Sequence, residues 1–315
     1  MILIEEVTKE YDQLGRQQGP LIAADRLSLE VPEGEVFGLI GPNGAGKTTT
    51  LKMLCGLLTP TSGKIIVNGV NVELQPDEAQ KHIGYLADFF SVYGNLKVWE
   101  YVDHFARAYK LDRGSLDTRV RQAIAQVGLE TKADSFVEEL SRGMKQRLGI
   151  ARAIVHDPAV LILDEPASGL DPKARVELKE LLRQLNRQGK TIFITSHVLS
   201  DLQEICTAVG VMEKGKLLKA GKIEEVMRSA GTARRVHLRL ASSGFELSRW
   251  LEGRGIISNP PSNPLSADFP FSGTDEDLAS LIKNLVQAGA PICSIEEKMD
   301  SLETIFSKLS SGEVM

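Results

Sequence analysis

Eight residues, Gly41 to Thr48, form the stretch of this sequence with the plainest chemical meaning. They spell Gly-Pro-Asn-Gly-Ala-Gly-Lys-Thr, which fits the phosphate-binding pattern G-x-x-x-x-G-K-[ST]. Glycines let the backbone curl with its N–H groups turned inward, and these groups bind anions together with a helix N-terminus. Lys47 adds a positive charge for the β- and γ-phosphates, and the hydroxyl of Thr48 can bind Mg²⁺. The loop predicts a nucleoside triphosphate site.

The segments on either side of this loop supply the context that the pattern requires. Residues 35–40 are mostly apolar and predict a buried strand, and residues 49–58 predict a helix. A glycine-rich turn before an ordinary helix is the alternative interpretation, because chance produces the pattern in roughly one chain in a hundred of this length. The rest of the chain must therefore supply partners for the loop.

Two adjacent acids follow the most apolar segment of the chain. Residues 160–163 are Val-Leu-Ile-Leu and predict a central parallel strand that is buried on both faces, with Asp164 and Glu165 directly after it. Ligands bind beyond the carboxyl ends of parallel strands, so a solvated turn explains at most one of the two acids. The predicted strand 191–195 ends near His197 on the same sheet edge. A lone histidine is more often structural than catalytic, which leaves its role open.

The composition restricts the class of protein. The chain has 315 residues and a net charge of −5, from 37 basic and 42 acidic residues without a block of one sign, which argues against nucleic acid as a partner. No apolar run approaches the ~18 residues of a membrane-spanning helix, and acids near the N-terminus argue against a signal peptide. Cys55, Cys206 and Cys293 are expected to be buried free thiols in a reducing compartment. The five histidines show no spacing typical of a structural metal site.

The elements that must position these residues indicate an α/β fold. Short strands in residues 1–40 predict an antiparallel β subdomain, and residues 97–139 are mostly helical, an insertion within the α/β pattern. The composition changes near Ser229. Beyond it, residues 236–240 and 292–295 predict strands, residues 275–287 and 301–309 predict helices, and residues 259–264 form a proline-rich loop, without a chemical motif. We expect a small α+β packing or regulatory domain there.

Aromatic residues are concentrated in one short stretch. Residues 85–109 hold 8 of the 17 aromatic residues, and some of these recur at helical spacing, as core residues do. Phe89, Phe90 and Tyr93 do not fit that spacing and are expected in a loop, either tucked into the core or forming an exposed interaction patch. Tyr11 stands alone in a polar stretch, as a turn residue or as a platform on which a nucleotide base stacks.

Taken together, these motifs resemble those of the ATP-binding cassette ATPases, the motor subunits of ABC transporters. The resemblance covers about residues 1–228, with a helical subdomain at about 89–156, and leaves 229–315 as a C-terminal accessory domain. Residues 41–48 resemble the Walker A loop and residues 160–165 resemble Walker B. Residues 140–146, Leu-Ser-Arg-Gly-Met-Lys-Gln, resemble the family signature L-S-G-G-Q, and residues 168–171 resemble the loop that follows Walker B.

The resemblance implies a P-loop NTPase with a mainly parallel sheet, acting as a head-to-tail dimer with ATP and Mg²⁺. Glu165 is the expected general base, and His197 matches the switch histidine. The residues expected to bind nucleotide are Tyr11, Gly41, Pro42, Asn43, Gly44, Ala45, Gly46, Lys47, Thr48 and Thr49. Ser141, Gly143 and Asp171 are expected to act across the dimer, and Thr48, Asp164 and Asp88 near the metal.

Two departures from the family pattern stand out. The signature has Arg142 and Met144 where the family usually has Gly and Gln, a form similar to a branch of exporters. Asp88 occupies the place of a glutamine that approaches Mg²⁺ and the attacking water and links the site to the membrane partner. Our hypothesis is that Asp88 still senses Mg²⁺·ATP, with altered coupling.

The expected partners are a second ATPase copy and a separately encoded transmembrane permease, which would dock near Phe89, Phe90 and Tyr93. The protein would lie peripherally on the cytoplasmic face of the membrane. Residues 301–306 resemble the tail of exporter ATPases of the drug and polysaccharide type, which favours export. The alternatives are a soluble cassette ATPase that acts on ribosomes or nucleic acid, and an ATP-binding regulator without turnover. The transported substrate is not predicted by this sequence.

Overall fold

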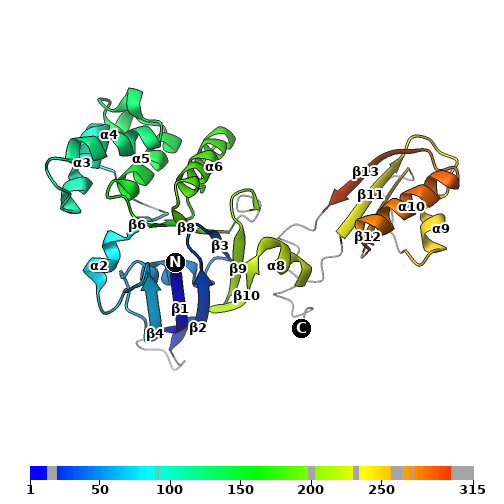
Figure 1. Cartoon of the computed structure of the whole chain (residues 1–315), viewed down its shortest axis with the longest axis horizontal. Coiled ribbons are helices and arrows are strands. Elements are labelled where there is room, and N and C mark those ends of the chain that lie inside the picture. The colour runs from blue at the N-terminus through cyan, green and yellow to red at the C-terminus, as the bar shows by residue number, and fades with distance from the viewer. Residues whose placement is uncertain are drawn as a thin grey trace. The chain divides into compact units, whose positions relative to one another are not determined.

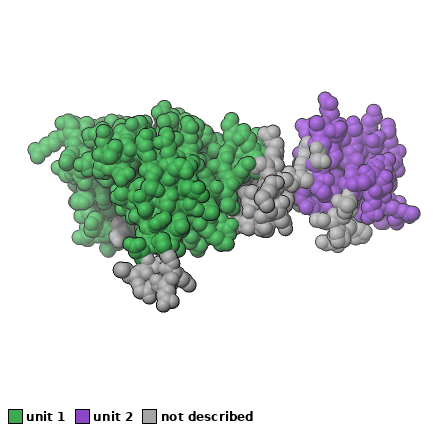
Figure 2. Space-filling view, turned by 90° about the horizontal axis from the view of Figure 1, so that it is seen from below, with its two compact units in different colours: residues 1–226 green, residues 227–315 purple. Residues whose placement is uncertain are grey.

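A computed structural model describes residues 1–12, 20–88, 90, 92–197, 203–229, 234–256, 265–271 and 273–298. The chain divides into two compact units, residues 1–226 and 227–315, which Figures 1 and 2 distinguish. Several sequence predictions lie outside the described residues. These are the docking residue Phe89, the start of the helix after His197, the loop at 259–264 and the helix at 301–309.

A six-stranded sheet forms the centre of the first unit and has the order β10-β9-β3-β8-β7-β6. Five of its strands are parallel, and only β10 runs antiparallel to its neighbour β9. The strands are β3 (Val36–Ile40), β6 (Ile83–Leu86), β7 (Val160–Asp164), β8 (Thr191–Ser196), β9 (Ala208–Glu213) and β10 (Lys216–Lys222). Every residue of β7 is buried, as the apolar run predicts for a strand covered on both faces. The predicted α/β class with a mainly parallel sheet is confirmed.

A second, antiparallel sheet contains β1 (Ile2–Tyr11), β2 (Leu21–Val31), β4 (Ser62–Val67) and β5 (Val70–Asn71), in the order β2-β1-β4-β5. Asn68 and Gly69 connect β4 to β5 with φ angles of 49° and 80°, the left-handed values that a tight two-residue hairpin requires. The two sheets share one apolar core, in which Ile4 and Val67 belong to the same cluster as Phe193.

The helices described in this unit fall into three groups. Helix α1 (Lys47–Leu54) follows β3, and α6 (Pro172–Arg187) follows β7. A helical insertion gathers at one end of the unit (Figure 1) and contains α3 (Val98–Ala108), α4 (Leu116–Gln126), the short η1 (Glu130–Lys132) and η2 (Val137–Glu139), and α5 (Arg142–Ile154). Two short helices are α2 (Pro76–Lys81) and α8 (Ile223–Ser229). The helix predicted at 49–58 spans Lys47–Leu54 in the structure, so it begins and ends earlier than expected and is shorter.

The second unit has its own sheet, with the order β12-β11-β13. Its elements are β11 (Arg234–Leu240), α9 (Leu247–Glu252), β12 (Ser266–Phe271), α10 (Asp275–Gln287) and β13 (Ile292–Lys298). Alternate residues of β11 are buried together with the apolar face of α10, so the unit has a separate core. A capping box between Thr274 and Asp277 defines the start of α10.

One expectation about the cysteines is wrong. Cys55 and Cys206 are buried free thiols, but Cys293, on β13 of the second unit, is exposed. In the part of the chain that the structure describes, no helix is both long and apolar enough to cross a membrane.

Candidate functional site

The glycine-rich loop leaves the carboxyl end of β3 and turns sharply into α1. Gly44 and Gly46 have φ angles of 81° and 107°, which side-chain-bearing residues rarely adopt. A Cβ atom at Gly46 would also collide with the carbonyl oxygen of Ala23 and the side chain of Met212. The Nζ atom of Lys47 donates hydrogen bonds to the carbonyl oxygens of Gly41 at 2.7 Å and Pro42 at 3.3 Å. The lysine therefore folds back over the loop that it follows.

Asp164 ends β7 beside a threonine that sequence reasoning missed. The carboxylate is 3% exposed, and its Oδ1 accepts a hydrogen bond of 2.6 Å from the Oγ1 of Thr195. The two residues are paired in the parallel register of β7 and β8. Aligning the two predicted strands by their ends would have pointed to Thr195. The hydroxyl fixes the orientation of a carboxylate at the sheet edge.

Glu165 lies between two cationic or potentially cationic groups. Its Oε1 is 3.6 Å from the Nζ of Lys47, and its Oε2 accepts hydrogen bonds from the Nδ1 of His197 at 2.7 Å and from the His197 backbone N–H at 3.2 Å. Its backbone has a φ of 48°, a left-handed value for a residue with a side chain. The backbone N–H of Glu165 donates to the carbonyl and hydroxyl oxygens of Thr195, which hold this conformation.

A cavity of about 440 Å³ brings most of the predicted nucleotide-binding residues together. This volume is within the range of ligand sites. Its lining comprises Tyr11, Leu21, Ala23, every residue from Pro42 to Thr49, Asp88, Asp164 and Glu165. Gly41 is not among the lining residues but accepts a hydrogen bond from Lys47, and His197 reaches the site through Glu165. Leu21 and Ala23 were missed, although the antiparallel pairing of Tyr11 with Leu21 brings them there.

Asp88 adds a third carboxylate to this cavity. Burial raises the pKa of Asp88 above its ordinary value, and the negative charges of Asp164 and Glu165 raise it further, while Arg142 and His197 oppose the rise. Among the described residues, no group of three or more His, Cys, Asp or Glu side chains is arranged to hold a metal by itself. The hydroxyl of Thr48 and the carboxylate oxygens nonetheless fit Mg²⁺ that arrives with phosphate ligands, since Mg²⁺ takes oxygen donors and shares them with substrate phosphates.

The three residues expected to act across a dimer do not line this cavity. Ser141 is the exposed N-cap of α5, and its Oγ accepts the backbone N–H of Met144 at 3.3 Å. Asp171 caps α6 in the same way, through the N–H of Ala174 at 2.9 Å. A Cβ atom on Gly143 would lie 2.8 Å from the Cβ of Ala174, so the first turns of the two helices are in close contact.

Phe90 and Tyr93 differ in exposure, so they fit different interpretations of the loop aromatics, as core residues or as an exposed patch. Phe90 is half-buried, and the guanidinium of Arg152 lies 5.4 Å from the centre of its ring. Tyr93 is 54% exposed, with one edge against the ring of His104 at 6.1 Å between centroids. Of the two loop aromatics that the structure describes, Phe90 and Tyr93, it is Tyr93 that is largely exposed.

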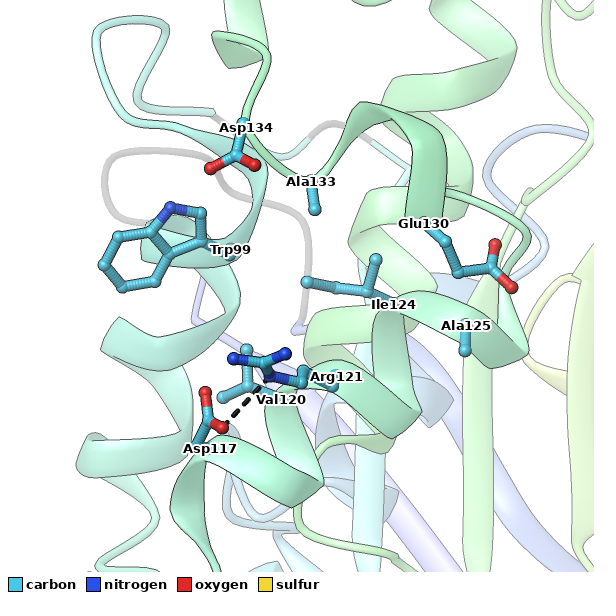
Figure 3. Close-up of a pocket in the computed structure, with 9 residues that line it drawn as sticks. All are labelled: Trp99, Asp117, Val120, Arg121, Ile124, Ala125, Glu130, Ala133 and Asp134. Atoms are coloured by element: carbon cyan, nitrogen blue, oxygen red, sulfur yellow. Dashed lines mark ion pairs between the residues drawn. The ribbon is translucent and has the colours of Figure 1, made fainter.

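A second cavity, of about 630 Å³, lies within the helical insertion (Figure 3). Its apolar lining includes Val120 and Ile124 of α4, and the half-exposed ring of Trp99 from α3 stands at one side. The charged residues on it are Asp117, Arg121, Glu130 and Asp134. Three of these four lining residues are acids, of which Asp117 pairs with Arg121 at 3.0 Å and Asp134 pairs with Lys97 at 3.9 Å.

The glycine loop after a parallel strand, with carboxylates at the ends of neighbouring strands, defines a P-loop nucleotide-binding protein. A family model described as "ABC transporter" matches residues 24–168. A protein of Escherichia coli named "Probable multidrug ABC transporter ATP-binding protein YbhF" is 38% identical over 221 residues, which span 70% of this chain and 38% of that protein. The bacitracin transport ATP-binding protein BcrA of Enterococcus faecalis is 32% identical over 322 residues, 99% of each chain.

A solved structure agrees with these relatives. The dimeric post-hydrolysis state of the ATP-binding cassette MJ0796, bound to ADP and Pi, is 26% identical with a TM-score of 0.63 and covers 71% of this chain and 99% of its own. This chain belongs to the family of ABC transporter ATP-binding proteins, which confirms the resemblance found in the sequence.

Proposed function

We propose that this chain is the ATP-hydrolysing subunit of an ABC exporter and drives a separately encoded membrane permease. The observation that carries the proposal is the position of Glu165, held beside the phosphate-loop cavity between Lys47 and His197. The relatives named for multidrug and bacitracin transport favour export. The protein would be peripheral, on the cytoplasmic face of the membrane.

The geometry supports a hydrolysis mechanism that begins with Lys47. A triphosphate in the loop competes with Glu165 for the Lys47 ammonium, because both are negatively charged. Once Lys47 turns to the phosphates, Glu165 can accept a proton from the attacking water, while its bond to His197 keeps the carboxylate oriented. Thr48 and Asp164 would hold Mg²⁺, which neutralises charge on the phosphates. The aromatic ring of Tyr11 at the cavity wall suits stacking on the adenine base.

We propose further that hydrolysis needs a head-to-tail dimer. Ser141 and Asp171 are exposed and lie outside the cavity of their own chain, and the N-terminus of α5 offers N–H groups and a positive dipole end to a phosphate. Gly143, the second residue of α5, carries no side chain, and this allows the close contact of α5 with Ala174 of α6 beside the proposed dimer surface. Residues 1–228 would form the ATPase domain, with 229–315 as an accessory domain.

The surface proposed for the permease begins at Phe90 and Tyr93, together with Phe89. Tyr93 exposes half of its side chain, and the acid-rimmed groove beside Trp99 lies on the same helical insertion (Figure 3). Cytoplasmic loops of membrane proteins carry an excess of Lys and Arg. A basic cytoplasmic segment with an apolar side chain therefore complements this groove in charge and in polarity.

Two measurements test the proposed function. Glu165→Gln should abolish phosphate release and accumulate an ATP-bound dimer in gel filtration, whereas continued turnover would remove Glu165 from the role of base. Affinity purification from native membranes should recover a polytopic membrane protein. Recovery of ribosomes or nucleic acid in its place would favour the soluble cassette alternative, and a wild-type protein without turnover would favour the regulator.

A further inference from the structure

Arg142 makes contacts that a solvated surface arginine does not need. It is the first residue of α5, directly after the N-cap Ser141, and is exposed. Its Nη2 nevertheless donates a hydrogen bond of 3.0 Å to the carbonyl oxygen of Ser168. The guanidinium packs so closely on Gly169 that a Cβ atom there would overlap three of its atoms. Gly169 also has a φ of 64°, so both space and backbone conformation require glycine.

The carbonyl that Arg142 contacts belongs to the loop that begins at Glu165. The backbone N–H of Ser168 donates to the carbonyl oxygen of Glu165 at 3.0 Å, which closes a tight turn. The loop then ends at Asp171, the N-cap of α6. Arg142 thus fixes the turn that directly follows the proposed base. Its positive charge also lowers the pKa of Asp88, so the guanidinium lies within electrostatic reach of the nucleotide cavity.

We infer that Arg142 is a positioning residue for hydrolysis, which ties the signature helix α5 to the loop that starts at Glu165 of the same chain. The inference rests on the proposed dimer, in which Ser141 beside it faces the nucleotide of the second copy. When α5 contacts the nucleotide bound by the second copy, Arg142 then transmits this contact to Glu165, the base that acts on the nucleotide of its own chain. Glycine, which the family usually has here, has no side chain to do this.

The experiment compares Arg142→Ala and Arg142→Lys with the full-length protein. We expect Arg142→Ala to lower kcat about tenfold, the scale of one charge-assisted hydrogen bond, and to bring the Hill coefficient for ATP close to 1. KM for ATP and the dissociation constant of a fluorescent ATP analogue should stay within about twofold, because the cavity itself is unchanged. Lysine keeps the charge and one donor and should recover a large part of kcat.

Two further variants make the result specific. Gly169→Ala keeps residue 142 as arginine but puts a methyl group where its guanidinium lies, so it should displace the guanidinium and reproduce the loss of kcat and of cooperativity. Arg187→Ala is the matched control, because Arg187 is an exposed arginine of α6 whose ion pair is with Glu180 of its own helix. It should leave both parameters unchanged.

The inference is overturned if Arg142→Ala retains wild-type kcat and Hill coefficient. It is also overturned if kcat falls only in parallel with the melting temperature and the affinity for the ATP analogue, since that pattern indicates a structural role alone. Failure of the wild-type protein to hydrolyse ATP would instead refute the proposed function on which the inference depends.

Discussion

Thr195 offers the sharpest test of how the site is held together. Its Oγ1 donates a 2.6 Å hydrogen bond to the buried carboxylate of Asp164 and accepts the backbone N–H of Glu165 at 3.1 Å. Thr195→Val keeps the shape of the side chain and removes both bonds. A hydrogen bond to a charged group contributes about 1.5–3 kcal/mol, and Asp164, at 3% exposure, cannot recover the loss from solvent. We expect the free energy of unfolding to fall by about that amount.

The effect on catalysis should concern the metal ion. Loss of a residue that orients a metal ligand typically lowers metal affinity by about 10–100-fold. We therefore expect Thr195→Val to raise the Mg²⁺ concentration for half-maximal ATPase activity by this factor, measured at saturating ATP. Thr195→Ser is the control, because it keeps the hydroxyl and loses one buried methyl group, at a cost of about 1 kcal/mol in stability. Equal Mg²⁺ dependence in the two variants would refute the assigned role of the hydroxyl.

Three further predictions concern other parts of the first unit. Burial lowers the pKa of His156 to about 4, below its value in the unfolded chain. The contribution of this residue to stability is therefore complete at neutral pH and is lost as the pH drops through 6.5 towards 4. By urea denaturation we expect about 2–3 kcal/mol less unfolding free energy at pH 4.5 than at pH 7, and a smaller loss in His156→Gln. Tyr11→Ala should weaken ATP binding by about 1–3 kcal/mol in calorimetry while Tyr11→Trp preserves it, and equal weakening in both would exclude stacking. Lys47→Ala should abolish binding of the ATP analogue while Lys52→Ala on the exposed side of α1 does not, and retained binding would exclude Lys47 from phosphate contact.

Local sequence patterns predicted the elements of this fold well because their causes are local. The helix starts show such local causes in the structure: the Asp171 side chain accepts a backbone N–H at the start of α6, Pro172 has no N–H that needs a partner, and Ser141 caps α5 as Asp171 caps α6. The uniformly apolar run before Asp164 identified a central strand. In contrast, α9 and β12 in the second unit were missed, because their short segments have neither strong periodicity nor clear caps. Cys293 was misplaced because the exposed face of a strand in a small sheet does not differ in composition from its neighbours.

The candidate site was predictable as a set of residues but not as a set of contacts. The glycine loop and the acids at 164 and 165 follow from motif and strand order, whereas the hydrogen bond from Thr195 depends on the register between two strands 31 residues apart in sequence. The ion pair between Lys47 and Glu165 depends on where a loop and a strand end meet in space. Such contacts are set by tertiary packing, which no single segment encodes.

The contacts of Glu165 explain why its backbone can adopt an unfavourable conformation. A left-handed φ of 48° costs a non-glycine residue of order 1 kcal/mol, and the structure must offset this cost through specific bonds. Two bonds from its N–H to Thr195 and two from His197 to its carboxylate do so. The left-handed turn directs the Glu165 carboxylate towards Lys47, whereas an extended backbone at this residue would continue strand β7. The conformation of Glu165 is therefore a consequence of ending a buried strand with a side chain that must face the phosphate loop.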